Sequence, residues 1–289
     1  MRTDVWAWLG VCALVPTLDL ESKSLVAMAQ RDVVIIRPDR TPVRVKVYRP
    51  WTARCRGVAV VSPGAGGSEQ GYAYLGHGLS EVGWLTVVVG HNEGNRKAIR
   101  GSWQGGRLSE TLASLIADPR AQASRLADLA AARQWAQQNC GDSNSVLIGH
   151  SMGAAAAMIE AGARNKLGIR GSTAFTAYIA MSPQGSGSIF PVHAWSELRR
   201  PVLSLTGTRD TGLGGVSWRT RLEPFRSMPP GCKWLAVIDG ASHLQFAGRG
   251  NSQRVQGLTL ATITGFLESV QQGDCRPARR DPAIRLQIK

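Results

Sequence analysis

The sequence lacks a long apolar segment, which a membrane-spanning helix needs. The first long uncharged apolar run, residues 5–18, contains Pro16 and is shorter than the roughly 18 residues that a spanning helix requires. The only comparable stretch, residues 146–159, is interrupted by His150 and Ser151. With 43% hydrophobic and 19% charged residues, the composition is globular, which argues against disorder and coiled coil. We therefore predict a folded body without stable membrane insertion.

Acidic residues are also scarce, because 20 Asp and Glu stand against 34 Lys and Arg, a formal net charge of +14. A basic surface attracts nucleic acid, anionic lipid and acidic substrates. The basic residues are scattered, however, and no DNA- or RNA-binding motif accompanies them. We interpret the charge as a solvated, arginine-rich surface and predict no nucleic-acid partner.

The cysteines do not form a metal-binding pattern. They stand at positions 12, 55, 140, 232 and 275, with no C-x-x-C pair and no Cys/His ligand spacing. Four of them lie beyond residue 29 and can form two disulfides, for which three pairings are possible. Cys232 and Cys275 flank the last predicted strand and helix, which commonly pack together, so we favour that pair. Four free thiols in a cytosolic protein are the alternative.

Residues 1–29 have the features of a secretory signal peptide. Arg2 gives a small positive start, residues 5–18 have the length of the apolar region, and residues 27–29 (Ala-Met-Ala) fit a small-x-small cleavage site. The alternative is an N-terminal helix that stays on the protein. We accordingly expect a periplasmic or secreted protein, with a cytoplasmic location as the alternative.

Beyond residue 29, short apolar β-rich runs alternate with longer helical patterns, which is typical of a parallel α/β sheet with strands buried on both faces. The predicted strands are 32–36, 43–48, 57–62, 85–89, 146–148, 178–181, 202–206 and 234–238. The predicted helices are 71–82, 121–138, 152–163, 217–223 and 252–272. We predict one domain over residues 30–272 without a large cap, followed by a basic tail over residues 273–289.

A G-x-S-x-G motif, residues 149–153, follows a buried strand and precedes an alanine-rich helix. This context predicts a sharp strand-to-helix turn that exposes the Oγ of Ser151 as a nucleophile. Glycine is needed at 149 and 153 because a side chain there would collide with the neighbouring strand or helix. The alternative is a simple turn.

A second glycine-rich loop, residues 63–68, follows the strand 57–62. Acyl transfer needs two backbone N–H groups aimed at the carbonyl oxygen, and we assign them to Ala65 in this loop and to Met152 after the nucleophile. The alternative, a phosphate-binding loop, would need a glycine where Glu69 stands or a Gly-Lys-Ser/Thr sequence, and neither is present.

A base and an acid are expected on the loops after the last two strands. His243 follows the final strand and is the predicted base, whereas His150 is expected to pack or hydrogen-bond beside the turn. Asp210 follows the penultimate strand and would orient the imidazole of His243. Asp239, four residues before His243, is the alternative acid.

Ser151, Asp210 and His243 follow one another in the order of the α/β-hydrolase fold. With SPGAGGS at 62–68, SPQG at 182–185 and GTRD at 207–210, the chain resembles predicted dienelactone-hydrolase-like and cutinase- or acetylhydrolase-like esterases. This resemblance implies the α/β-hydrolase fold, with a mostly parallel central sheet, helices on both faces and no large cap domain. Dienelactone hydrolases typically use a cysteine nucleophile, whereas this chain has a serine.

These features predict a serine hydrolase that cleaves small-molecule carboxylic esters through an acyl-enzyme on Ser151 and needs no metal or organic cofactor. Loops at strand ends supply the substrate-binding candidates, which are His91, Gln184, His193 and Trp195. The alternatives are an acyltransferase or peptidase using the same triad, or a hydrolase-like protein that only binds its partner. Natural substrate, acyl chain length and oligomeric state stay open.

The signal-peptide interpretation makes a direct prediction. Exported protein should begin near Gln30, because cleavage would follow the small residues at 27–29. Intact-mass measurement of the secreted material checks this. Exported protein that retains Met1 would contradict the cleavage.

Overall fold

The computed structural model describes residues 30–289 except 53, 94–98, 102–106, 142–143 and 278–280. The expected signal peptide lies outside the described residues. In the described part of the chain, none of the helices is both long and apolar enough to span a bilayer.

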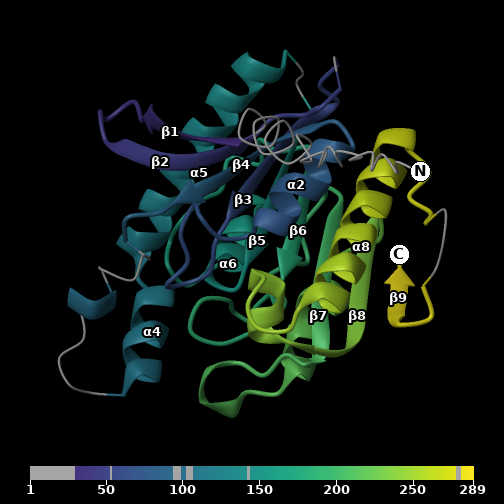
Figure 1. Cartoon of the computed structure of the whole chain (residues 1–289). Helices are drawn as coiled ribbons and strands as arrows, with labels where there is room; N and C mark the ends of the chain where they lie inside the picture. Colours follow the sequence, from purple (N-terminus) through teal and green to yellow (C-terminus); the bar gives the residue numbers. More distant parts are fainter. Residues whose placement is uncertain (1–29, 53, 94–98, 102–106, 142–143, 278–280) are drawn as a thin grey trace, which may run out of the picture.

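A nine-stranded sheet runs through the described residues in the order β1-β2-β4-β3-β5-β6-β7-β8-β9 (Figure 1). Strands β3 to β8 pair in parallel, whereas β1, β2 and β9 run antiparallel to their neighbours. The sheet is therefore mostly parallel, as predicted. The strands are β1 (Gln30–Ile36), β2 (Pro42–Tyr48), β3 (Gly57–Ser62), β4 (Trp84–Gly90), β5 (Ser145–His150), β6 (Ala177–Met181), β7 (Val202–Arg209), β8 (Lys233–Ser242) and β9 (Ile284–Ile288).

Helices cover both faces of this sheet, which is why its central strands are apolar throughout. Helices α5 and α6 pack on one face, and α2 and α8 pack on the other (Figure 1). The helices are α2 (Ala73–Glu81), α4 (Leu108–Ile116), α5 (Pro119–Cys140), α6 (Met152–Glu160), α7 (Glu223–Ser227) and α8 (Gln253–Gln272). Single 3₁₀ turns are η1 (Leu213–Gly215), η2 (Trp218–Leu222) and η3 (His243–Ala247).

The prediction of a basic tail over residues 273–289 is wrong in part, because residues 284–288 belong to the sheet. Strand β9 pairs antiparallel with β8, and Ile284, Leu286 and Ile288 pack against the core beneath α8. The apolar residues alternate with polar ones, as in an edge strand that buries one face. This pattern is only five residues long and follows an arginine-rich stretch, which masks it in the sequence.

Helix α4 was not predicted either. It lies between the predicted strand 85–89 and the predicted helix 121–138, and none of its residues is fully buried. Its apolar residues, Leu108, Leu112, Leu115 and Ile116, do have helical spacing. The helix is only nine residues long, however, and follows a glycine-rich segment, which is typical of a connection.

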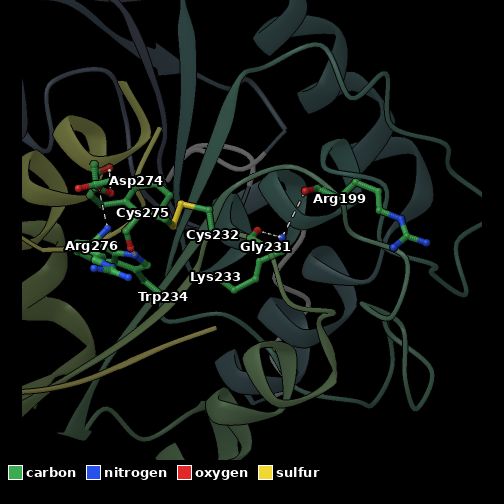
Figure 2. Close-up of a disulfide and its surroundings, with 10 residues drawn as sticks. Arg199, Gly231, Cys232, Lys233, Trp234, Asp274, Cys275 and Arg276 are labelled. Carbon is green, nitrogen blue, oxygen red and sulfur yellow. Dashed lines mark hydrogen bonds between the residues drawn. A yellow bond between two sulfur atoms is a disulfide. The ribbon is translucent and has the colours of Figure 1, made fainter. Parts of the chain in front are cut away.

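Two disulfides link segments that are distant in sequence. Cys55 and Cys140 join the segment before β3 to the end of α5, with their Cα atoms 5.5 Å apart. Cys232 and Cys275 join the start of β8 to the segment after α8, with their Cα atoms 5.3 Å apart (Figure 2). The second is the pairing favoured from the sequence. Trp234 Nε1–H donates to the carbonyl of Cys275 at 3.1 Å, which holds this link against β8.

These disulfides predict the thiol content and stability of the chain that starts at Gln30. Thiol titration of this chain, denatured but not reduced, should find no free cysteine. Replacing Cys232 and Cys275 together with serine should lower the free energy of unfolding by about 2–4 kcal/mol, because a constraint on the unfolded chain is lost. Urea unfolding measures the loss. Four reactive thiols in the unreduced chain would contradict both pairings.

Candidate active site

Ser151 stands at a sharp turn between β5 and α6, in a backbone conformation that few residues adopt. Its φ is 54° and its ψ is −117°. A Cβ on Gly149 would lie 2.1 Å from the carbonyl oxygen of Gly153, and a Cβ on Gly153 would lie 2.0 Å from that of Ser62. Both distances are far below any real contact, so the turn requires glycine at both positions. The strain at Ser151 is held by this close packing.

The structure brings Ser151, His243 and Asp210 together from three strand ends. His243 Nε2 lies 3.0 Å from Ser151 Oγ, and His243 Nδ1 lies 2.8 Å from Asp210 Oδ1. A carboxylate can only accept, so the Nδ1 proton of His243 is donated to Asp210. Nε2 is then free to accept the proton of the Ser151 hydroxyl. This arrangement can turn the serine into a nucleophile.

Asp239, the alternative acid, lies elsewhere. Its carboxylate accepts from Thr208 Oγ1 at 3.1 Å and lies 3.6 Å from Arg285 Nη2. It is exposed and belongs to the end of β8, so it does not contact His243 in this geometry.

Arg221, which sequence reasoning missed, holds the carboxylate in place. Its Nε lies 3.1 Å from Asp210 Oδ1, and its Nη1 donates to the carbonyl of Ser182 at 2.7 Å. Burial alone would raise the pKa of Asp210, but the hydrogen bond from His243 and the charge of Arg221 outweigh it and lower the pKa below its ordinary value. No motif marks Arg221, which reaches the site from η2. Only the fold reveals its role.

The proposed oxyanion donors lie on either side of Ser151. Met152 begins α6, so its N–H has no partner within the helix and lies at the positive end of the helix dipole. Ala65 lies in the loop after β3 and lines the cavity over Ser151. A Cβ on Gly64 would lie 3.1 Å from Ser151 Cβ, which shows how closely this loop approaches the nucleophile.

His150 sits behind the turn in a fully bonded position. Its Nε2 lies 3.1 Å from the carbonyl oxygen of His243, and its Nδ1 lies 2.8 Å from Tyr72 Oη. Burial, reinforced by the neighbouring His243, holds the pKa of His150 well below its ordinary value, so the ring is neutral. The carbonyl can only accept; Nε2 therefore carries the proton, and Nδ1 accepts from the tyrosine. This fits the expectation that His150 supports the turn.

A cavity of about 1330 Å³ opens over Ser151 and His243. Gln184 lines it, as expected for a substrate-binding residue. Much of its wall is apolar, with contributions from Leu112, Ile116, Ile189, Leu213, Val216 and Leu244. Among the described residues that line the cavity, none is acidic. Within the same described ranges, no group of three His, Cys, Asp or Glu side chains could hold a metal ion.

The structure contradicts the other three predicted substrate-binding residues, because none of them lines the cavity. His91 is buried between Ser62 and Asp128, with its Nδ1 2.8 Å from the carboxylate. Trp195 is buried in the core, where its ring packs on Phe190. His193 is exposed at the surface beside that packing. Proximity to a strand end does not say which way a side chain points.

No family model and no curated protein matches the chain. Several solved structures, by contrast, are similar to this chain. A putative dienelactone hydrolase from Klebsiella pneumoniae has a TM-score of 0.60 at 17% identity, covering 84% of this chain and 99% of that one. An α/β serine hydrolase without lid from Xanthomonas campestris has a TM-score of 0.54 at 17% identity, covering 87% and 97%. An esterase from Pyrococcus furiosus has a TM-score of 0.58 at 15% identity, covering 85% and 94%. The chain has the α/β-hydrolase fold.

The chain carries no cap in the connection from β6 to β7, where residues 182–201 contain neither helix nor strand. The cavity over Ser151 is instead bordered by loops and by α4. At identities below 25%, the likeness establishes the fold, and the chemistry has to be argued from the site.

The lowered pKa of Asp210 predicts a pH effect on the stability of the protein. The ionised carboxylate stabilises the fold fully above its ordinary pKa of about 4, and this contribution is lost as pH falls through the lower folded-state pKa. Asp210→Asn should therefore lose less stability than the parent on acidification from about pH 5 to about pH 2. Urea unfolding at both pH values measures this. The exposed control Asp239→Asn should follow the parent, and equal slopes for all three proteins would contradict the assignment.

Proposed function

We propose that this protein is a serine hydrolase that cleaves carboxylic esters of small molecules through an acyl-enzyme on Ser151. The observation that carries the proposal is the chain of contacts from Ser151 Oγ through His243 to Asp210, at 3.0 Å and 2.8 Å, beneath an open cavity. The first contact has the donor and the acceptor that proton transfer requires, and the second holds the imidazole in the tautomer that accepts the proton.

In the first half of the reaction, Ser151 Oγ attacks the ester carbonyl carbon while its proton moves to His243 Nε2. The carbonyl electron pair moves onto oxygen, and the N–H groups of Met152 and Ala65 donate to the resulting oxyanion. When the intermediate collapses, the bond to the alcohol oxygen breaks. His243 returns its proton to that oxygen, and the acyl group stays on Ser151.

In the second half, water attacks the acyl-enzyme and His243 accepts its proton. The acid leaves when the proton returns to Ser151 Oγ. During both halves Asp210 stabilises the imidazolium of His243, and Arg221 favours the ionised form of Asp210. Arg221 is thus part of the proposed machinery and acts through Asp210.

The lining of the cavity supports an ester with an apolar group. Leu112 and Ile116 on α4 and Ile189 on the facing loop offer apolar contact to an acyl chain or an alcohol. Arg44 and Arg249 also line the cavity, and the absence of acidic residues among its described lining leaves an anionic group unopposed.

The two disulfides support an oxidising compartment, because disulfides persist in the periplasm or outside the cell and are rare in the cytosol. We therefore place the hydrolase in the periplasm or outside the cell.

The proposal predicts that Ser151 and His243 act as one unit. Ser151→Ala should lower kcat for nitrophenyl esters by roughly 10⁴ or more, and adding His243→Ala should cost little further, because a base without its nucleophile activates nothing. Asp210→Asn should be severe and Asp239→Asn mild. Turnover across esters of increasing chain length, with circular dichroism to verify folding, measures this.

Two outcomes would contradict the proposal or its details. If a folded Ser151→Ala variant keeps most of the activity, the proposed serine mechanism is wrong. A larger loss from Asp239→Asn than from Asp210→Asn shows that the acid is misplaced. Adding alcohol or amine acceptors to the assay separates hydrolysis from acyl transfer, because transfer would yield a new ester or amide in place of the acid.

A further inference from the structure

The peptide unit between Pro63 and Gly64 is held from both sides by buried side chains. Its carbonyl oxygen, on Pro63, accepts from Arg125 Nη1 at 2.7 Å. Its N–H, on Gly64, donates to Tyr72 Oη at 3.1 Å. Arg125 is 2% exposed and Tyr72 is 4% exposed. This peptide directly precedes Ala65, so its orientation fixes the direction from which the N–H of Ala65 approaches the cavity.

The same two side chains also contact the nucleophile side of the site. Arg125 Nη2 lies 3.4 Å from Met152 Sδ. Tyr72 Oη donates to His150, the residue before Ser151, and His150 in turn donates to the carbonyl of His243. Arg125 therefore touches both segments that carry the proposed oxyanion donors, and Tyr72 connects one of them to the base.

The further hydrogen-bond partners of Arg125 also lie inside the protein. Its Nη1 also donates to Ser62 Oγ at 3.2 Å. His91 Nδ1–H donates to the carboxylate of Asp128, so Nε2 of the neutral ring accepts from the Ser62 hydroxyl at 3.0 Å. The hydrogen bonds from Ser62 through His91 to Asp128 repeat the order of those from Ser151 through His243 to Asp210. Ser62 is fully buried, however, and cannot meet a substrate.

Keeping a guanidinium in this position is costly. Burial lowers the pKa of Arg125 to about 10, against the attraction of Asp128. Packing alone would be served as well by an apolar side chain of similar volume. A buried cation whose shortest bond goes to one carbonyl of the oxyanion loop therefore indicates a role in fixing that loop.

We propose that Arg125 and Tyr72 are positioning residues that clamp the Pro63–Gly64 peptide and thereby aim the N–H of Ala65 at the oxyanion. This inference rests on the proposed function. Releasing the clamp lets the peptide rotate, which weakens a bond made chiefly in the transition state. Tyr72 also borders the cavity, but its hydroxyl is bonded to Gly64 and His150, so removing the hydroxyl alone should leave substrate binding in the ground state nearly unchanged.

The test uses Tyr72→Phe, Arg125→Met and the double variant of the whole protein on a nitrophenyl ester. Each single change should lower kcat about tenfold or more, below the about 10²–10³-fold effect of deleting a donor outright, while KM stays within about threefold. The double variant should lose less than the product of the single losses, because both residues hold the same peptide.

A second readout isolates the oxyanion. A trifluoromethyl ketone adds to Ser151 as a hemiketal whose oxygen would occupy the same position. Its inhibition constant should rise by the same factor by which kcat/KM falls. A purely structural defect that lowers the amount of folded enzyme would reduce kcat but leave this constant unchanged.

Two matched variants provide the controls. Tyr178→Phe removes another buried tyrosine hydroxyl, which bonds to the carbonyl of Glu160. Arg133→Met removes another inward-facing arginine of α5, which donates to Ser145 Oγ at 3.0 Å. Both should keep the parent kcat and inhibition constant. If Arg125→Met does not fold, Tyr72→Phe, which removes a single oxygen atom, carries the test.

The outcomes separate the two proposals. A parent protein without ester turnover, or with turnover that survives Ser151→Ala, overturns the proposed function. An active parent that depends on Ser151, with clamp variants that keep its kcat and inhibition constant, overturns the clamp. A rise in KM at unchanged kcat also overturns it, because the two residues would then bind substrate.

Discussion

Almost no space separates β3 from the turn that connects β5 to α6, and this tight approach governs the site. The backbone of α6 at Gly153 lies against the carbonyl of Ser62, so a single methyl group would force the two segments apart. The approach holds Ser151 in its unusual conformation and keeps the loop after β3 beside it. The proposed nucleophile and the proposed oxyanion donors therefore share one geometric requirement, and neither can be moved without the other.

Two buried arginines lie on opposite sides of this turn, each next to a carboxylate. Arg221 contacts Asp210 on the side of the base, and Arg125 lies near Asp128 on the side of the oxyanion loop. In each case the guanidinium also donates to backbone carbonyls, at Ser182 and at Pro63. Planar groups with several fixed donors suit this task, because they join separate loops into one rigid unit.

The sequence predicted the parts of this protein that have strong local patterns. The central strands were predictable because they are apolar throughout. The meeting of Ser151, Asp210 and His243 was predictable because each follows such a strand. Strand β9 and helix α4 were missed because they are short, with five and nine residues, and follow segments rich in arginine or glycine.

The supporting residues had no such pattern. Arg221, Arg125 and Tyr72 meet the site only through tertiary contacts, which spacing along the chain does not encode. The same limit explains why His91 and Trp195, both beyond strand ends, proved to point into the protein. Strand ends could be located from the sequence, but side-chain directions could not.

The disulfide between Cys232 and Cys275 also affects what happens when the edge strand β9 detaches from β8. Strand β8 offers one side to β7 and the other to β9, so it would have an open edge whenever β9 detached. The disulfide holds Cys275 beside the start of β8, and β9 begins only nine positions later in the sequence. A detached β9 would therefore stay at a high effective concentration near β8, which favours its return over pairing of β8 with a strand of another molecule.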